Sequence, residues 1–383
     1  MTRKIVIITE IIAPYRIPVF NALARQDGMA LHVIFLAETD KALRQWLVYT
    51  EEIRFSHEVL RSWRFRAGRL SLLVNRGLRS ALDAANPQAI LCGGYNYPSS
   101  WNALRWARRR NVRFVLWTES NQRDKRSGHA VIEWLKRYFV NSCDGFVVPG
   151  KASFAYLRSL GVGESCIFTA PNAVDITLFA MHAEKVKTEA VSFRARFGLP
   201  QRFILFVGRL VPEKGVFDLI QAYAKLESDL RSKVGLVFVG DGVSTEALSE
   251  QAKSIAPGTI CFPEFAQRED LAGFYALAEA AVLPTHTDTW GLVVNEAMAC
   301  GLPVISSSAA GCVADLIESG WNGLIVSGGE IGQLASAMDK LASNEDLRSL
   351  MGQRSRQRIA QFSPEAWAAG MAQVAFLQRG RAA

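Results

Sequence analysis

The stretch FVGRLVPEKGVFDLIQAY, residues 206 to 223, places two cations between an apolar strand and a helix. The apolar run from Phe203 to Val207 has the length and composition of a buried strand, and a helix is expected to begin near Val216. Arg209 and Lys214 stand in the loop between them. In a doubly wound parallel sheet such a loop binds phosphate, because the free N–H groups at the start of the helix attract anions. The stretch therefore predicts an α/β fold with a phosphate site at the end of this strand.

The residue types in this loop suit a diphosphate. Gly208 lets the backbone turn without a side chain, Arg209 offers a planar fork to phosphate oxygens, and Lys214 adds a point charge. The alternative is a solvated loop in which Lys214 pairs with Glu213 or Asp218. The loop lacks the Gly-Lys-Ser/Thr sequence of a P-loop, so hydrolysis of a nucleoside triphosphate is not indicated.

Short apolar runs alternate with amphipathic stretches along the chain, which is the pattern of strand–helix units around parallel sheets. A chain of 383 residues is also longer than one compact core usually holds. We expect two domains, residues 1–183 and 184–363, connected through the polar stretch 175–201, with a last helix at 364–380 that crosses back onto the first domain. Strands are expected at 5–9, 31–36, 89–91, 113–117, 145–148 and 166–169, and at 203–207, 235–239, 259–262, 280–283, 304–306 and 324–325.

The composition indicates a globular protein without a membrane-spanning helix. Hydrophobic residues make up 49% of the chain and charged residues 21%, and no run of about 18 or more apolar residues occurs. The start, MTRKIVIITEIIAPY, is interrupted by Glu10 and lacks a small-residue cleavage site, so we interpret it as a first strand and expect a cytoplasmic protein. The six cysteines include no Cys-x-x-Cys pair, which indicates neither a disulfide framework nor a metal site.

The net charge of +8 is divided unevenly. Residues 1–183 carry 25 Lys and Arg against 14 Asp and Glu, whereas residues 184–383 carry 19 against 22. The basic residues of the first half concentrate in 61–82, 105–113 and 123–139, where Arg alternates with Trp, Phe and Leu. Such stretches suit an anionic membrane or glycolipid surface. The alternatives are ordinary solvated helix faces and nucleic acid, although no nucleic-acid recognition motif accompanies the charge.

A second informative stretch is PTHTDTWGLVVNEAMACGLPVISS, residues 284 to 307. It predicts a strand end, a loop with Asp288, and a helix that begins near Gly291 and carries Glu296. Carboxylates beside the free N–H groups of a helix start can hold a hydroxyl-rich ligand. The alternative makes Asp288 a helix cap and Glu296 an exposed helix residue. The apolar neighbours of Glu296 favour burial, and a buried carboxylate needs a partner.

Several motifs, taken together and in order, resemble the family 4 glycosyltransferases. They are GRLVPEKG, the Gly240-Asp241-Gly242 turn, the pair Asp288-x7-Glu296 running into AMACGLPVI, and DLIESGWNGLIV at 315–326, with PYRIPVFNALA at 14–24 and PNAVDITLF at 171–179 in the first half. The resemblance covers nearly the whole chain. It implies a retaining, nucleotide-sugar-dependent enzyme of the GT-B fold, in which two Rossmann-like domains face each other across a cleft.

The resemblance also implies roles for individual residues. Arg209 and Lys214 would grip the donor diphosphate, and Glu296 would bind the ribose hydroxyls. Backbone N–H groups near Trp290 would hold the sugar and the distal phosphate. The complete set of implied catalytic residues is Arg209, Lys214, Asp288 and Glu119, and the implied binding residues are Glu296, Gly208, Trp290, Gly291, Leu292, Phe265, Tyr15 and Arg16.

Two positions depart from the family pattern. Asp288 stands where the family usually has Glu, one methylene longer, and WTES at 117–120 stands where the family commonly has His-Asp, so that Glu119 and Ser120 replace the histidine or form a plain strand end. The first loop also lacks the family's frequent Gly-Gly pair, and Tyr15 and Arg16 occupy that region.

The implied reaction transfers a hexose from a UDP-, GDP- or ADP-sugar to a lipid-linked or surface glycan. The leaving phosphate would accept the acceptor's proton, so neither a dedicated nucleophile nor a metal nor another cofactor is expected. The implied partners are a nucleotide-sugar and a glycan or glycolipid. From its charge, the basic half is expected to make peripheral contact with an anionic membrane, and no nucleic acid is expected as a partner. The alternatives are a nucleotide-sugar epimerase and a scaffold that binds nucleotide-sugar without turning it over.

Overall fold

The structure is a computed structural model that describes residues 2–40, 46–67, 70–123, 130–263 and 265–376. The chain divides into two compact units, Met1–Asn172 with Pro364–Ala383, and Ala173–Ser363. The division lies before the boundary expected between residues 183 and 184. The reason is that α6 (Ile176–Thr188) packs on helices of the second unit.

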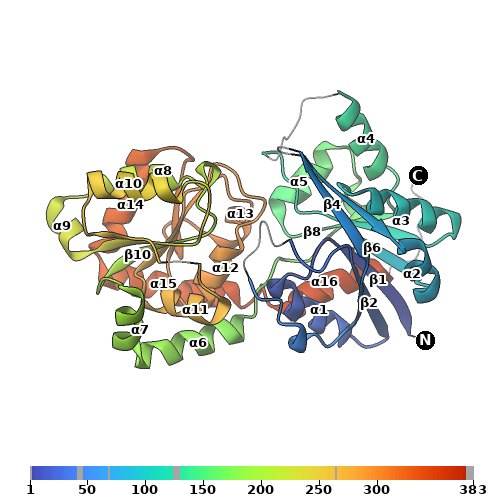
Figure 1. The fold of residues 1–383 in the computed structure, drawn as a ribbon, viewed down its shortest axis with the longest axis horizontal. Helices are drawn as coiled ribbons and strands as arrows, with labels where there is room; N and C mark the ends of the chain where they lie inside the picture. The colour runs from blue at the N-terminus through green and yellow to red at the C-terminus, as the bar shows by residue number, and fades with distance from the viewer. Residues whose placement is uncertain (1, 41–45, 68–69, 124–129, 264, 377–383) are drawn as a thin grey trace. The chain divides into compact units, whose positions relative to one another are not determined.

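The first unit is built on a seven-stranded parallel sheet with the order β3-β2-β1-β6-β7-β8-β9 (Figure 1). Its strands are β1 (Arg3–Thr9), β2 (Met29–Phe35), β3 (Ser56–Val59), β6 (Ala89–Gly93), β7 (Arg113–Trp117), β8 (Gly145–Val148) and β9 (Ile167–Thr169). Its helices are α1 (Ile17–Ala24), α2 (Leu78–Ala85), α3 (Pro98–Arg109), α4 (Ala130–Val140), α5 (Lys151–Ser159) and α16 (Pro364–Phe376), with 3₁₀ turns η1 (Pro14–Arg16), η2 (Thr50–Glu52) and η3 (Glu164–Cys166). Central strands such as β6 are buried on both faces, which explains their unbroken apolar sequences.

The last helix belongs to the first unit. Helix α16 packs on α1, β8 and β9, and Figure 1 shows the red helix beside the blue one. Trp367 of α16 is fully buried, with its ring centroid 5.6 Å from that of Phe20 and 5.5 Å from that of Trp117. Burial of these three aromatic rings fixes α16 to the first unit.

An antiparallel hairpin accompanies the first sheet, formed by β4 (Arg61–Ala67) and β5 (Leu70–Arg76). The alternative of 61–82 as a solvated helix face is therefore wrong for residues 61–67 and 70–76, and among the described residues of this stretch only those of α2, from Leu78 onward, are helical. The physical reason is the alternation of side chains along β4, which suits a strand with one inner and one outer face. The expected strands also omitted β3, which pairs with β2.

The second unit holds a six-stranded parallel sheet with the order β12-β11-β10-β13-β14-β15. Its strands are β10 (Phe203–Val207), β11 (Gly235–Val239), β12 (Ile260–Cys261), β13 (Ala280–Leu283), β14 (Val304–Ser307) and β15 (Gly323–Val326). Its helices are α6, α7 (Ala190–Phe197), α8 (Val216–Ala224), α9 (Ser228–Lys233), α10 (Thr245–Ile255), α11 (Arg268–Leu277), α12 (Leu292–Ala299), α13 (Val313–Leu316), α14 (Ile331–Ala342) and α15 (Glu345–Ile359), with the 3₁₀ turn η4 (Pro212–Lys214). Both sheets confirm the predicted Rossmann-like α/β class.

The strand order of the second sheet reverses between β10 and β13. From β10 the chain moves outward through β11 and β12, and it then returns to the other side of β10 with β13. From β10 and from β13 the chain therefore continues toward opposite ends of the sheet, and the loops that follow these two strands lie side by side at its carboxyl edge. Such a switch point is where open α/β sheets bind ligands.

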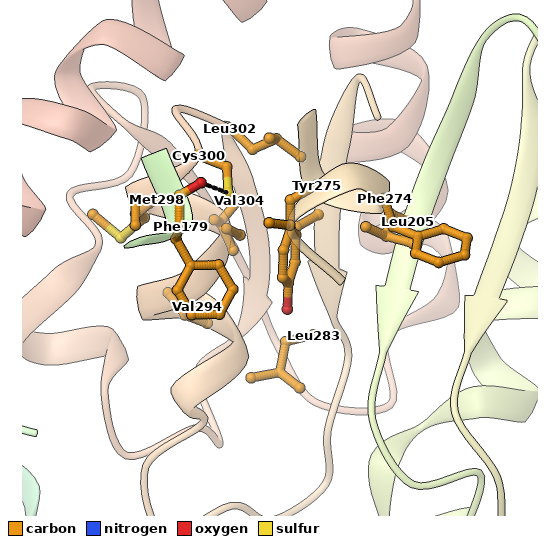
Figure 2. Close-up of a cluster of buried hydrophobic side chains, with 14 of the residues drawn as sticks. Phe179, Leu205, Phe274, Tyr275, Leu283, Val294, Met298, Cys300, Leu302 and Val304 are labelled. Atoms are coloured by element: carbon orange, nitrogen blue, oxygen red, sulfur yellow. Dashed lines mark hydrogen bonds between the residues drawn. The ribbon is translucent and has the colours of Figure 1, made fainter. Parts of the chain in front are cut away.

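The stretch 175–201, expected as a polar connection, is mostly helical and part of the second unit. Helices α6 and α7 bury Phe179 and Phe193 in a hydrophobic cluster that also contains residues of α11 and α12. Figure 2 shows Phe179 in this cluster with Tyr275, Val294 and Met298. These buried aromatic side chains make the segment part of a core, whatever its surface charge.

Candidate active site

The loop after β10 is held against the loop after β11. The N–H of Gly208 donates to the carbonyl of Val239 at 3.0 Å, and the N–H of Leu210 donates to the carbonyl of Asp241 at 2.9 Å. Gly240 has a φ of +139°, and a Cβ there would overlap the carbonyl oxygen of Gly208. The two loops can approach this closely only because residue 240 is glycine. The position of Arg209 is thereby fixed at the edge of the sheet.

Arg209 and Lys214 differ in their surroundings. Arg209 is exposed, and its guanidinium has no hydrogen-bond or ion-pair partner among the described residues. Lys214, at the end of η4, forms an ion pair with Asp288, and both side chains are largely buried. The structure thus brings Lys214 and Asp288 together across the switch point. It rejects the alternative in which Lys214 pairs with Glu213 or Asp218.

A second glycine allows η4 to lie close to the end of β13, where the loop that contains Asp288 begins. Gly215 has a φ of +69°, and a Cβ there would overlap the carbonyl oxygen of Pro284. The carbonyl of Glu213 accepts hydrogen bonds from the Thr285 hydroxyl at 3.0 Å and from the His286 N–H at 2.9 Å. The loops after β10 and β13 therefore form one connected structure, and the ion pair between Lys214 and Asp288 lies within it.

The segment between Asp288 and α12 is ordered by its own hydrogen bonds. Asp288 accepts from the N–H of Trp290 at 3.3 Å, and the buried indole of Trp290 donates to Asn295 at 2.8 Å. The expectation that the Trp290 N–H is available to a ligand is therefore not met in this structure, because Asp288 already accepts it. The N–H groups of Gly291 and Leu292, at the start of α12, have no acceptor among the described residues. These two groups give the helix start its capacity to bind an anion.

Glu296 lies on α12 and is half-buried. The hydroxyl of Tyr275, on α11, donates to its carboxylate at 2.8 Å. Burial raises the pKa of Glu296 to about 7, and the hydrogen bond from Tyr275 counteracts part of this rise. Figure 2 shows the Tyr275 ring in the middle of the hydrophobic cluster, so that its position is fixed by packing. The alternative of Glu296 as an exposed helix residue is therefore rejected.

Phe265 lies in the loop after β12, and its ring is exposed. It makes no ring contact among the described residues. The neighbouring Phe262 instead stacks on Phe238, with ring centroids 5.2 Å apart.

The remaining expected residues lie in the first unit, at the carboxyl edge of its sheet. Arg16, in η1 after β1, forms an ion pair with Glu119, which follows β7. The same guanidinium donates to Asn172 at 3.1 Å and lies 4.4 Å from the centre of the Trp117 ring. Tyr15 packs on Trp46, with ring centroids 5.9 Å apart. The structure therefore brings Arg16 and Glu119 together as partners, which restricts Glu119 as an independent acid or base.

Two neighbours of the expected residues were missed from the sequence. Tyr275 is the partner of Glu296, and Asn172 is a partner of Arg16. Asn172 lies within the quoted PNAVDITLF segment, but nothing local marks it as a contact of residue 16. Tyr275 lies in an apolar helix sequence, and such a sequence predicts a core residue rather than a partner of Glu296.

Removing only the Tyr275 hydroxyl should make the ionised form of Glu296 less stable. Because that hydrogen bond stabilises the carboxylate, Tyr275→Phe is expected to raise the pKa of Glu296 further and to lower stability by about 1 kcal/mol. Carboxyl chemical shifts in an NMR pH titration of the wild type and the variant measure the pKa. Tyr223→Phe, which removes another buried hydroxyl of the same unit, is the matched control. An unchanged Glu296 titration in Tyr275→Phe would contradict the assigned role of the hydrogen bond.

Two family descriptions match the chain in tandem. Residues 20–178 match "Glycosyltransferase Family 4", and residues 188–358 match "Glycosyl transferases group 1". The chain belongs to glycosyltransferase family 4. The two matches agree with the two sheets, and the switch-point residues lie within the second match.

Individual relatives agree with this assignment. The D-inositol 3-phosphate glycosyltransferase of Frankia alni is 30% identical over 213 residues, which is 52% of this chain and 52% of that protein. The chain spans about half the length of the curated relatives it matches.

Solved structures share the fold over almost the entire chain. HepE of Anabaena, in complex with UDP and glucose, superposes with a TM-score of 0.75 at 18% identity, over 97% of this chain and 98% of that one. Sucrose-phosphate synthase of Thermosynechococcus elongatus gives a TM-score of 0.74 at 21% identity, also over 97% and 98%. The fold is therefore GT-B.

Within the described ranges, none of the helices has the length and apolar character of a membrane span. In the same ranges, no three His, Cys, Asp or Glu side chains are grouped so that they could hold a metal ion.

Proposed function

We propose that this family 4 member transfers a hexose, with retention of configuration, from a nucleoside diphosphate sugar to a lipid-linked or surface-glycan acceptor. The observation that carries the proposal is the arrangement at the switch point of the second sheet. There, the cations Arg209 and Lys214, the start of α12 and the carboxylate of Glu296 occupy one carboxyl edge. This set suits a ligand that has a diphosphate at one end and a ribose at the other.

In the proposed complex, Arg209 and Lys214 bind the diphosphate, and the Gly291 and Leu292 N–H groups bind its distal phosphate or the sugar. Asp288 holds the Lys214 ammonium in place through the ion pair. Glu296 accepts hydrogen bonds from the ribose hydroxyls. Phe265 is proposed to contact the base.

The proposed reaction breaks the bond between the anomeric carbon and the diphosphate oxygen. The acceptor oxygen forms the new bond to the anomeric carbon on the same face, and its proton passes to the leaving phosphate. The negative charge that develops on the diphosphate is stabilised by Arg209, Lys214 and the helix start, which are positioned before the reaction. Such a reaction requires no metal ion and no dedicated nucleophile.

A phosphorylated cyclitol is a second candidate acceptor, because the matched relatives are named D-inositol 3-phosphate glycosyltransferases. Arg16 and Tyr15 are proposed to contact the acceptor, with Glu119 beside them. A screen that offers glycolipids and inositol phosphates in parallel decides between the two acceptor classes.

Thermal-shift measurements test the donor site directly. The panel consists of UDP, GDP, ADP and their common sugar conjugates, with UDP first because HepE was crystallised with it. A nucleotide at about a hundred times its dissociation constant stabilises the protein by about 2.7 kcal/mol. The matching nucleoside monophosphates are the controls, and they should shift the transition less because they lack the second phosphate.

The outcomes separate the alternatives. A protein that no nucleotide stabilises at millimolar concentration would contradict the proposed donor site. Conversion of the sugar nucleotide without an added acceptor would indicate an epimerase. Nucleotide binding without turnover on any acceptor would indicate a scaffold.

A further inference from the structure

The β4–β5 hairpin of the first unit exposes an apolar face. Trp63 lies opposite Val74 and Phe65 lies opposite Leu72 in the hairpin register. Their exposed fractions are 50%, 36%, 60% and 48%, respectively. Alternate residues of a strand point to the same side, so the four side chains share one face. A cluster of large exposed apolar side chains, unlike a single one, indicates an interaction surface.

The opposite face fixes the hairpin to the body of the unit. Leu73 is fully buried, and Arg64 forms ion pairs with Glu10 at 2.9 Å and with Asp40 at 3.1 Å. Glu10 follows β1 and Asp40 follows β2, so the hairpin is attached at the carboxyl edge of the first sheet. Figure 1 shows the hairpin as the blue ribbon labelled β4. The apolar face is therefore held outward by contacts on its other side.

Charge complements the apolar residues. Residues 61–76 contain five Arg and no Asp or Glu. Arg61 lies opposite Arg76, and both are exposed on the same face as Trp63 and Phe65, because they are separated from them by even numbers of residues. We define the hairpin face as Arg61, Trp63, Phe65, Leu72, Val74 and Arg76. It places two cations beside two apolar pairs.

We propose that the hairpin face docks on an anionic phospholipid membrane. Trp and other aromatic side chains favour the headgroup region, where the ring is partly buried, and Arg is attracted to anionic headgroups. A second copy of the chain fits less well, because two such faces would bring four arginines together without an acid in residues 61–76 to offset them. The membrane supplies both the apolar phase and the negative charge.

Docking in this orientation deepens the proposed function and rests on it for the identity of the acceptor. The hairpin is attached at the same edge of the sheet at which Arg16 and Glu119 lie. A membrane bound to the hairpin face would present the headgroup of a lipid-linked acceptor to that edge. The membrane would then be the source from which the first unit takes its acceptor.

Vesicle co-sedimentation of the full chain tests the proposal. Vesicles of phosphatidylcholine with about one third phosphatidylglycerol are compared with pure phosphatidylcholine vesicles. The wild type should bind the anionic vesicles, and Trp63→Ser/Phe65→Ser should lower the partition coefficient by at least about tenfold. Arg61→Ala/Arg76→Ala should lower it by about fivefold per arginine, and added salt should reduce this difference.

Met181→Ser/Val191→Ser is the matched control, because these two apolar residues are also well exposed, on helices of the second unit. The control should bind vesicles as the wild type does. All six changed side chains are exposed, and circular dichroism checks that each variant is folded. A wild type that ignores anionic vesicles, or a Trp63→Ser/Phe65→Ser variant that binds them normally, would overturn the proposal.

Two further measurements keep the outcomes distinct. The first is light scattering, which measures the oligomeric state. If the wild type is a dimer that Trp63→Ser/Phe65→Ser dissociates, and if the wild type binds no vesicles, the hairpin face is a self-association surface. That result would overturn membrane docking. The nucleotide thermal shift should be the same in all hairpin variants, because the donor residues lie in the second unit. Vesicle binding without any nucleotide shift would uphold the docking and refute the proposed function.

Discussion

Replacing Arg209 with Ala is expected to lower turnover by about 10²- to 10³-fold, because the guanidinium is proposed to stabilise the charge that develops on the leaving diphosphate. Its side chain is exposed and has no partner among the described residues, so its removal leaves no buried charge behind. The fold should therefore keep its stability while the rate falls. Release of nucleoside diphosphate from the best-binding sugar nucleotide, with acceptor present, measures the rate.

Lys253→Ala removes an exposed cation from α10, away from the strand ends, and is the control. Binding gives a second readout: Arg209→Ala should lose affinity for the nucleoside diphosphate but not for the nucleoside. Equal rates in Arg209→Ala and Lys253→Ala would refute the diphosphate contact.

Lys214 is a less direct probe of the same contact. Lys214→Ala would leave Asp288 largely buried without its counter-charge, so a loss of activity would mix a missing ligand contact with local destabilisation. The double variant Lys214→Ala/Asp288→Asn removes both charges. Comparison of the single and double variants separates the two effects.

The second sheet was predictable because its central strands are apolar runs. The observed bounds of β10, β11 and β13 coincide with the expected ranges 203–207, 235–239 and 280–283. Strands buried on both faces need apolar side chains at every position, and the glycines and polar residues that follow mark their ends. The expected strands therefore required no knowledge of distant contacts.

The β4–β5 hairpin was missed for the opposite reason. Its inner face carries Arg64, whose charge is neutralised by Glu10 and Asp40 from distant parts of the chain. Residues 62–66 do alternate polar and apolar side chains, but Arg64 points inward while the apolar Trp63 and Phe65 are exposed. The usual rule that apolar residues mark the inner face of a strand therefore fails here.

The candidate site was predictable in its residue types but not in its pairings. Sequence spacing placed Arg209 and Lys214 after one strand and Asp288 after another. The ion pair between Lys214 and Asp288 depends on β13 returning next to β10, which a local pattern does not specify. The same holds for Arg16 with Glu119 and for Tyr275 with Glu296, since each pair joins separate elements.

The affinity for a sugar nucleotide is expected to rise by about tenfold between pH 6 and pH 8, because the proposed ribose contact needs an ionised Glu296 whose pKa is about 7. Below that pKa the carboxyl is protonated, and binding must first remove the proton. A sugar nucleotide is the appropriate ligand, because its diphosphate has no titration near neutrality of its own. Isothermal titration calorimetry across this pH range measures the affinity.

Glu296→Gln keeps the shape of the side chain and removes the titration. The affinity of this variant for the sugar nucleotide should be about 10- to 100-fold lower than that of the wild type at pH 8, which is the usual effect of losing a hydrogen bond to a charged group. It should also be nearly independent of pH. Any pH dependence that persists in the variant arises from groups other than Glu296. A wild type whose affinity is flat from pH 6 to pH 8 would rule out the ionised Glu296 as the ribose acceptor.

The same group makes the free protein's stability depend on pH in the opposite direction. The pKa of Glu296 in the folded protein lies above its ordinary value of 4.5, so the folded state binds more protons than the unfolded state between these two values. Its contribution is therefore most favourable below pH 4.5 and decreases as the pH rises to about 7. Denaturant unfolding of the wild type and Glu296→Gln should isolate this slope. A ligand that binds ionised Glu296 would offset this loss of stability at neutral pH. Bound nucleotide should therefore stabilise the protein most at the pH values at which Glu296 of the free protein is ionised.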